Sequence, residues 1–152
     1  MDKNVNALNK RLKGDKISLL VIAGLMCFFG CAQIIKFILD GDVIFLKRGV
    51  QGLVMMVPHF ILFWILRRIA LTGKPFDDKV VRGMRLLAIS VIAAGVLPFF
   101  IEAMATVVKG DMFSFEINIF DLFIPLTGLI IGIISEIFVY GKELQEDNDL
   151  IA

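Results

Sequence analysis

The residues that could carry chemistry in this sequence are polar or ionisable side chains inside long apolar stretches. His59, the single histidine, directly follows Pro58 in the middle of one such stretch. Proline leaves the carbonyl one turn earlier without its helical N–H partner, and a neighbouring polar side chain can satisfy that carbonyl or hold a water. Imidazole also titrates near neutral pH, so His59 is a candidate proton or ligand sensor. A packing role and a sensing role both stay open.

Glu136 is a carboxylate inside the last apolar stretch, five residues before Gly141. Ionisable groups at membrane depth are costly, which makes them candidates for function. Because its side chain is too short to reach the membrane surface easily, we expect Glu136 to face the other helices and to pair with Arg67 or Arg68. Such a pair could fix helix packing, bind a proton or ion, or couple the helices to the C-terminal tail.

Two further carboxylates, Glu102 and Asp121, lie near the ends of the third and fourth apolar stretches. Pro98 and Pro125 interrupt the same stretches, so that with Pro58 three helices are expected to bend. A shared level of bending could open a small cavity, with either carboxylate at its mouth.

The helices that position these residues are expected to lie in a membrane. The chain has 152 residues, of which 58% are hydrophobic and 20% charged, and its mean hydropathy is +0.84. A soluble domain of this size could not bury that much apolar surface, because about a third of its extended-chain area stays exposed after folding. The composition excludes a disordered chain, and a net charge of +1 gives no reason to expect direct binding of nucleic acid.

Four apolar stretches are long enough to cross the hydrocarbon core, which takes about 20 residues per helix. The predicted spans are 17–39, 46–69, 84–107 and 119–140, followed by a cytosolic tail at 141–152. Lengthening the second span places Lys47 and Arg48 at the membrane interface. The predicted fold class is therefore all-α, an integral membrane four-helix bundle that forms a single domain over residues 1–152.

The distribution of basic residues predicts the orientation, since Lys and Arg in short loops resist translocation. The N-terminal segment, the loop between spans two and three, and the tail hold 12 of the 16 basic residues, and the two other loops hold 4. Both termini are therefore expected in the cytoplasm. The first span could instead be a removed signal peptide, but its apolar run continues past Cys31 without a clear cleavage site, which favours a retained anchor.

Turn and capping residues are expected at the ends of the helices. Gly41 lies between two aspartates and suits a tight reversal, and Gly73 can end the second helix. Asp77 or Asp78 is expected to cap the third helix before it enters the membrane. Residues 112–118 fit either a short interfacial helix or an extended stretch.

Gly128 and Gly132 form a G-x-x-x-G pattern in the last span. Such a pattern lets another helix backbone approach closely. The close partner is either another helix of the same chain or a second copy, so a homodimer through these glycines is an open alternative.

The tail is acidic and has two interpretations, a solvated extension of the last helix or a docking segment for a cytosolic partner. Its candidate docking residues are Glu143, Leu144, Glu146, Asp147, Asp149 and Leu150.

Enzyme signatures are not found in the sequence: there is no P-loop, HExxH, CxxC or recognisable catalytic triad, and no cofactor or metal site is expected. The leading hypothesis is a membrane protein that engages a soluble partner in signalling or regulation. The alternative is a small transporter or ligand sensor with a pocket around His59, Pro98 and Glu136.

Two segments resemble a bacterial membrane family known as domain of unknown function 2975. One is Gly73-Lys74-Pro75-Phe76 with the acidic cap and basic helix start that follow, and the other runs from Ser135-Glu136 through Gly141-Lys142-Glu143-Leu144 to Asp149-Leu150. The family has a basic pair after the final span where this chain has Val139 and Tyr140. The resemblance implies four helices in the bacterial cytoplasmic membrane, no established chemistry, and a cytosolic helix-turn-helix DNA-binding regulator as a possible partner.

Overall fold

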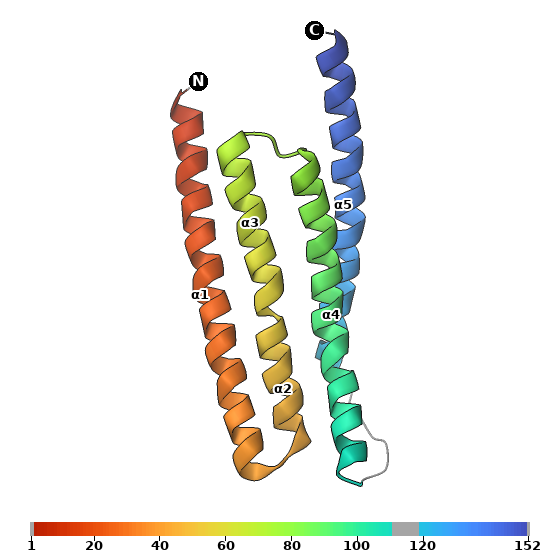
Figure 1. Ribbon diagram of the computed structural model, residues 1–152. Helices are drawn as coiled ribbons and strands as arrows, with labels where there is room; N and C mark the ends of the chain where they lie inside the picture. Colours follow the sequence, from red (N-terminus) through yellow and green to blue (C-terminus); the bar gives the residue numbers. More distant parts are fainter. Residues whose placement is uncertain (1, 111–118, 152) are drawn as a thin grey trace.

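The protein is all-α over the residues that the structure describes. The computed structural model describes residues 2–110 and 119–151, with side chains for 12–110, 119, 121–144 and 147. Its helices are α1 (Asp2–Asp40), α2 (Val43–Val54), α3 (Met56–Thr72), α4 (Asp78–Val108) and α5 (Ile119–Ile151), drawn in Figure 1. The predicted fold class is confirmed, whereas residues 112–118, for which the sequence left two alternatives, lie outside the described part.

Four stretches of helix are long and apolar enough to cross a membrane. They are Leu12–Asp40, Val43–Thr72, Asp78–Val108 and Asp121–Leu144, and each overlaps one predicted span. α1 and α5 continue beyond the apolar stretch at the end of the molecule where both termini lie (Figure 1). The predicted tail is therefore helical as far as Ile151, as expected for an extension of the last helix.

The second span consists of two helices rather than one. α2 ends at Val54 and α3 begins at Met56, with a turn at Met55. Pro58 has no N–H to donate to the carbonyl of Val54, four residues earlier, so the regular hydrogen-bond ladder stops there. The expected bend at Pro58 thus takes the form of a break three residues before it.

The glycines that follow α1 and α3 have the predicted turn conformation. Gly41 has φ 72° and Gly73 has φ 66°, a left-handed conformation that glycine adopts without steric cost. The Asp42 carboxylate accepts a hydrogen bond from the Ile44 N–H at 3.0 Å and so caps α2. Asp77 occupies the N-cap position of α4, but its carboxylate makes no capping hydrogen bond.

The helices pack in a row in which α4 is central. α1 packs on α2 and α3, these two pack on α4, and α4 packs on α5; within the described residues, the backbone of α1 does not approach α4 or α5. The core is small and centres on Ile65, Val80, Leu87 and Val91. Of the 18 consecutive residues that form the most apolar part of α4, 44% are buried, whereas the corresponding share is 11% in α1 and in α5. The two outer helices therefore present most of their apolar surface outward.

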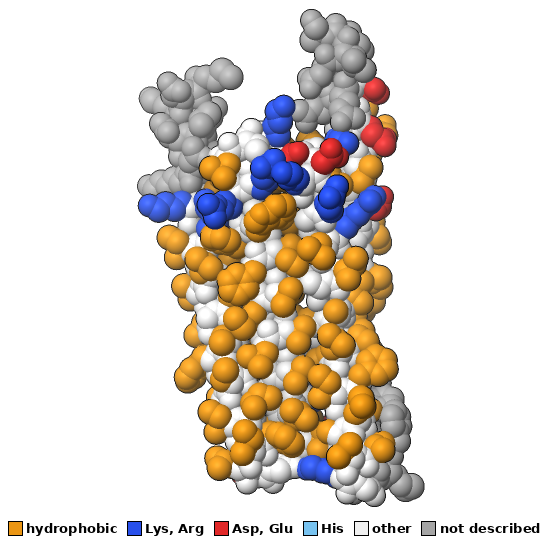
Figure 2. Space-filling model, in the orientation of Figure 1, with side chains coloured by type: hydrophobic (Ala, Val, Ile, Leu, Met, Phe, Trp, Pro, Cys, Tyr) orange, Lys and Arg blue, Asp and Glu red, His pale blue; other side chains and the backbone are white. Residues whose placement is uncertain are grey.

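The surface matches a membrane environment. Figure 2 shows hydrophobic side chains over most of the visible face and a band of Lys and Arg towards the end where the termini lie. The only tryptophan and tyrosine, Trp64 and Tyr140, are both exposed, and each lies within a few residues of charged residues that belong to this end, Arg67 and Lys142. Such aromatic residues favour the boundary between hydrocarbon and water.

Candidate functional site

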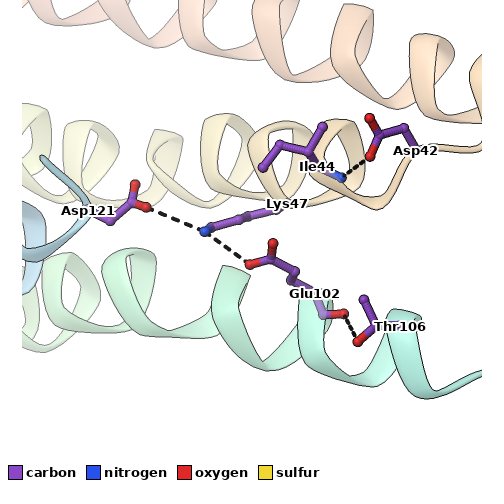
Figure 3. Close-up of polar contacts among 6 residues, drawn as sticks. All are labelled: Asp42, Ile44, Lys47, Glu102, Thr106 and Asp121. Atoms are coloured by element: carbon purple, nitrogen blue, oxygen red, sulfur yellow. Dashed lines mark hydrogen bonds and ion pairs between the residues drawn. The ribbon is translucent and has the colours of Figure 1, made fainter. Parts of the chain in front are cut away.

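Three ionisable side chains from three helices meet in the interior, near the end of the molecule opposite the termini. Lys47 of α2 lies between Glu102 of α4 and Asp121 at the start of α5, as Figure 3 shows. The Lys47 Nζ is 3.0 Å from Glu102 Oε2 and 3.4 Å from Asp121 Oδ2. The side chains of Lys47, Glu102 and Asp121 are 4%, 7% and 19% exposed. We refer to these three residues as the buried triad.

Local structure positions two members of the triad, Lys47 and Glu102. Lys47 lies in the second turn of α2, whose start is capped by Asp42. Its ammonium is also 4.2 Å from the centre of the Phe99 ring, one turn before Glu102 on α4, at a distance typical of a cation–π contact. The Thr106 hydroxyl donates to the Glu102 carbonyl at 3.2 Å and to the Ala103 carbonyl at 2.8 Å. The ammonium is thus enclosed by carboxylates and an aromatic face.

The charges of the triad define what it can do. Two carboxylates and one ammonium sum to one excess negative charge when all are ionised. A buried charge is strongly unfavourable without its partner. The ion pairs therefore favour one position of α2, α4 and α5 relative to one another.

Sequence reasoning found two members of the triad and missed the third. Glu102 and Asp121 were expected at the mouth of a cavity, whereas the structure pairs them with Lys47. Lys47 was expected at the membrane interface, but it is 3% exposed and faces the protein interior. The signal in the sequence is that Lys47 lies near the start of the second span, while Glu102 lies near the end of the third and Asp121 near the start of the fourth. In a bundle of antiparallel spans these three positions lie at the same end.

The predicted partner of Glu136 was wrong. Its carboxylate pairs with Arg85 of α4, with Arg85 Nη2 3.2 Å from Oε1 and 3.3 Å from Oε2. Neither Arg67 nor Arg68 contacts it, because α5 packs on α4 and not on α3. Glu136 also does not face the interior, since its side chain is 64% exposed.

Arg68 instead joins α3 to the loop that follows it. Its Nε donates to the Asp77 Oδ2 at 2.9 Å, across the turn that contains Gly73. The hydrogen bond and positive charge of Arg68 lower the pKa of Asp77 below its usual value. Arg67, the other predicted partner, is exposed.

His59 makes the kind of hydrogen bond that its packing interpretation predicts. Its Nδ1 is 2.7 Å from the Met55 carbonyl, the position at which α2 and α3 are separated, and it donates when Nδ1 carries the proton. The residues of the expected pocket are dispersed. Pro98 is fully buried in α4, and the groove that Glu136 lines includes neither Pro98 nor His59.

Gly128 allows close packing within the chain. A Cβ at Gly128 would lie 2.6 Å from Ile92 Cγ1 and 2.8 Å from Ile92 N, so α4 occupies this face of α5. At Gly132 a Cβ would lie 3.7 Å from the Ala88 Cβ, which is an ordinary contact. Both glycines line a groove of about 460 Å³ between α4 and α5, which we call the α4–α5 groove.

The C-terminal extension, residues 141–151 of α5, is held at its base. Gly141 packs on the Phe76 ring, where a Cβ would lie 2.8 Å from Phe76 Cε1, and Phe76 is 5.4 Å from the Phe138 ring. The Lys142 Nζ is 2.7 Å from Asp78 Oδ1 at the start of α4. These contacts fix the direction in which the extension leaves the other helices.

The candidate docking residues are partly described. Glu143, Leu144 and Asp147 are exposed on the extension. For Glu146, Asp149 and Leu150 the structure describes the helical backbone, and their side chains lie outside the described part.

Comparison of the chain with protein-family models, with curated proteins and with solved structures finds no match.

Proposed function

We propose that this protein is a multi-pass protein of the bacterial cytoplasmic membrane that docks a cytosolic partner on its C-terminal extension. The observation that carries the proposal is a charged helix that continues beyond the apolar part of α5 and is fixed at its base by Phe76 and by the Lys142–Asp78 ion pair. A docking element held in one orientation loses less conformational freedom on binding than a flexible tail.

The charge of the extension indicates the kind of partner. Residues 141–151 contain one lysine and four acidic residues, Glu143, Glu146, Asp147 and Asp149. Exposed carboxylates attract a basic surface and raise the rate of association with it. A DNA-binding regulator has such a surface, and a helix-turn-helix regulator is the partner that the family resemblance suggests.

The orientation in the proposal rests on basic residues. Twelve of the 16 Lys and Arg residues belong to segments at the end where the termini lie, and basic segments stay on the cytoplasmic side. The extension is then on the side of the membrane where a soluble regulator is found.

The proposal is tested with the purified full chain in detergent and the purified helix-turn-helix regulator encoded nearest to its gene. We expect Glu143→Lys together with Asp147→Lys to weaken binding about tenfold or more, since like charges then face each other. The matched control is Asp15→Lys, a charge reversal at an exposed position of α1. Equal affinity of the wild type and the double variant for the regulator contradicts the proposal.

A further inference from the structure

The α4–α5 groove begins at the polar boundary of the apolar region. Arg85 immediately precedes the uncharged run 86–101, and it forms the ion pair with Glu136 at one end of the groove. Both side chains are more than half exposed, at 53% and 64%. A charged pair at this position lies at the level of lipid headgroups.

Below this pair the groove is mostly apolar and open on one side. Isoleucine and leucine side chains line it together with Ser135. Space remains at its base because Ala88, Gly128 and Gly132 carry little or no side chain. From Arg85 to Ile92 the groove follows α4 for about 10 Å, at a rise of about 1.5 Å per residue. An apolar slot of this length that opens towards the lipid fits part of a hydrocarbon chain.

The ion pair leaves hydrogen-bonding capacity for a headgroup. The contact with Glu136 uses the Nη2 atom of Arg85, and a guanidinium has further N–H donors on Nε and Nη1. Arginine binds phosphate well through such donors, and the Glu136 carboxylate accepts hydrogen bonds from an ammonium group.

We propose that the α4–α5 groove is a binding site for one phosphatidylethanolamine molecule, with its phosphate at Arg85, its ammonium at Glu136 and one acyl chain in the apolar slot. The charges favour this headgroup over an anionic one. Ethanolamine phosphate carries one negative and one positive group, which match Arg85 and Glu136 respectively. An anionic lipid such as phosphatidylglycerol pairs with Arg85 but lacks a cation for Glu136.

The experiment is native mass spectrometry of the purified full chain in detergent with an equimolar mixture of phosphatidylethanolamine and phosphatidylglycerol. We expect one bound phosphatidylethanolamine and about a tenfold preference for it, as a charge-assisted hydrogen bond can supply. Glu136→Gln is expected to abolish this preference. Phosphoethanolamine without acyl chains is expected not to bind, which separates a lipid site from a site for the headgroup alone.

A second variant tests the slot itself. Gly132→Leu places a side chain in the groove, since a Cβ there meets only Ala88 at an ordinary distance, and we expect it to reduce phosphatidylethanolamine binding about tenfold. Gly24→Leu is the matched control, because Gly24 is an exposed position of α1 with no atom within 4 Å of the added Cβ. A thermal melt of each variant verifies that it is folded.

Three results overturn the proposal. The first is equal binding of the two lipids by the wild type, and the second is unchanged binding in Gly132→Leu. The third is a dimer of the wild type that Gly132→Leu dissociates without any change in bound lipid, which would assign the groove to a second copy of the chain.

Discussion

Lys47 lies in surroundings that are unusual for a lysine. A lysine is almost never fully buried unless it is paired, and Lys47 is enclosed by Glu102, Asp121 and the Phe99 ring. Its position in the sequence predicted an interfacial lysine, because hydropathy describes depth along a helix and not the direction in which a side chain points. The pairing depends on how α2, α4 and α5 are rotated against one another, which one sequence does not specify.

Replacing Lys47 by methionine is expected to destabilise the protein strongly. Lys47→Met keeps the length of the side chain but leaves Glu102 and Asp121 as buried carboxylates without their ammonium, a change that costs about 3–5 kcal/mol in buried ion pairs. Lys36→Met is the matched control, because Lys36 is exposed and its Nζ lies 4.2 Å from the Phe45 ring centre; that substitution should cost less than about 1 kcal/mol. Unfolding in detergent measures both.

A second comparison separates the triad from a general sensitivity of this region. If Lys47→Met is combined with Glu102→Gln and Asp121→Asn, the unpaired charges are removed and much of the stability should return. A triple variant that is less stable than Lys47→Met would contradict the role assigned to the ion pairs.

Asp77 provides a pH-dependent contribution at the loop between α3 and α4. Arg68 lowers the pKa of Asp77 in the folded protein, so the ion pair stabilises the fold above the unfolded pKa of about 3.9. That contribution is lost as the pH falls through the lower, folded pKa. We expect the difference in melting temperature between the wild type and Asp77→Asn to be constant near neutral pH and to shrink in acid.

The measurement is a series of thermal melts in detergent from neutral pH into the acid range. Asp15→Asn, the same change at an exposed position of α1, is the control for effects of the substitution on net charge. A difference between the wild type and Asp77→Asn that does not depend on pH would contradict the contribution of the Arg68–Asp77 pair.

At the scale of helices, the spans and turns were predictable and the order of packing was not. Span positions follow from runs of apolar residues, and the turn at Gly73 follows from local backbone requirements, so both can be read from neighbouring residues. The expected pairing of Glu136 with Arg67 or Arg68 failed because it assumed that α5 lies against α3. The actual partner, Arg85, is on α4, and only the packing of α5 on α4 brings it within reach.

The contact between α4 and α5 gives a test with two neighbouring glycines. Gly128→Ala would place its Cβ 2.8 Å from the backbone N of Ile92, so the helices must separate, at a cost of about 1–3 kcal/mol. Gly132→Ala has room and removes a flexible residue from a helix interior, which should stabilise the protein by about 0.5–1 kcal/mol. Melting temperatures that change in the same direction in both variants would contradict this difference.

At the scale of the whole molecule, the central prediction is the number and direction of the crossings. Asp40 lies at the end of α1 and Lys74 in the loop after α3, at opposite ends of the molecule (Figure 1). In a chain whose own Cys27 and Cys31 are replaced by serine, Asp40→Cys should react with a membrane-impermeant maleimide on intact cells. Lys74→Cys should react only after the membrane is permeabilised, and the reverse pattern would contradict the proposed orientation.

The packing of the helices in a row has a consequence for how the chain is assembled during synthesis. In the part of the chain that the structure describes, every extensive interface joins one span to the next in the sequence: α1 to α2 and α3, these to α4, and α4 to α5. Each interface can therefore form as soon as the following span leaves the ribosome and enters the bilayer, and no span has to wait for a distant one. The exception is Lys47, whose second carboxylate, Asp121, is supplied by the last span. Completion of the ionic contacts of Lys47 thus coincides with the arrival of α5.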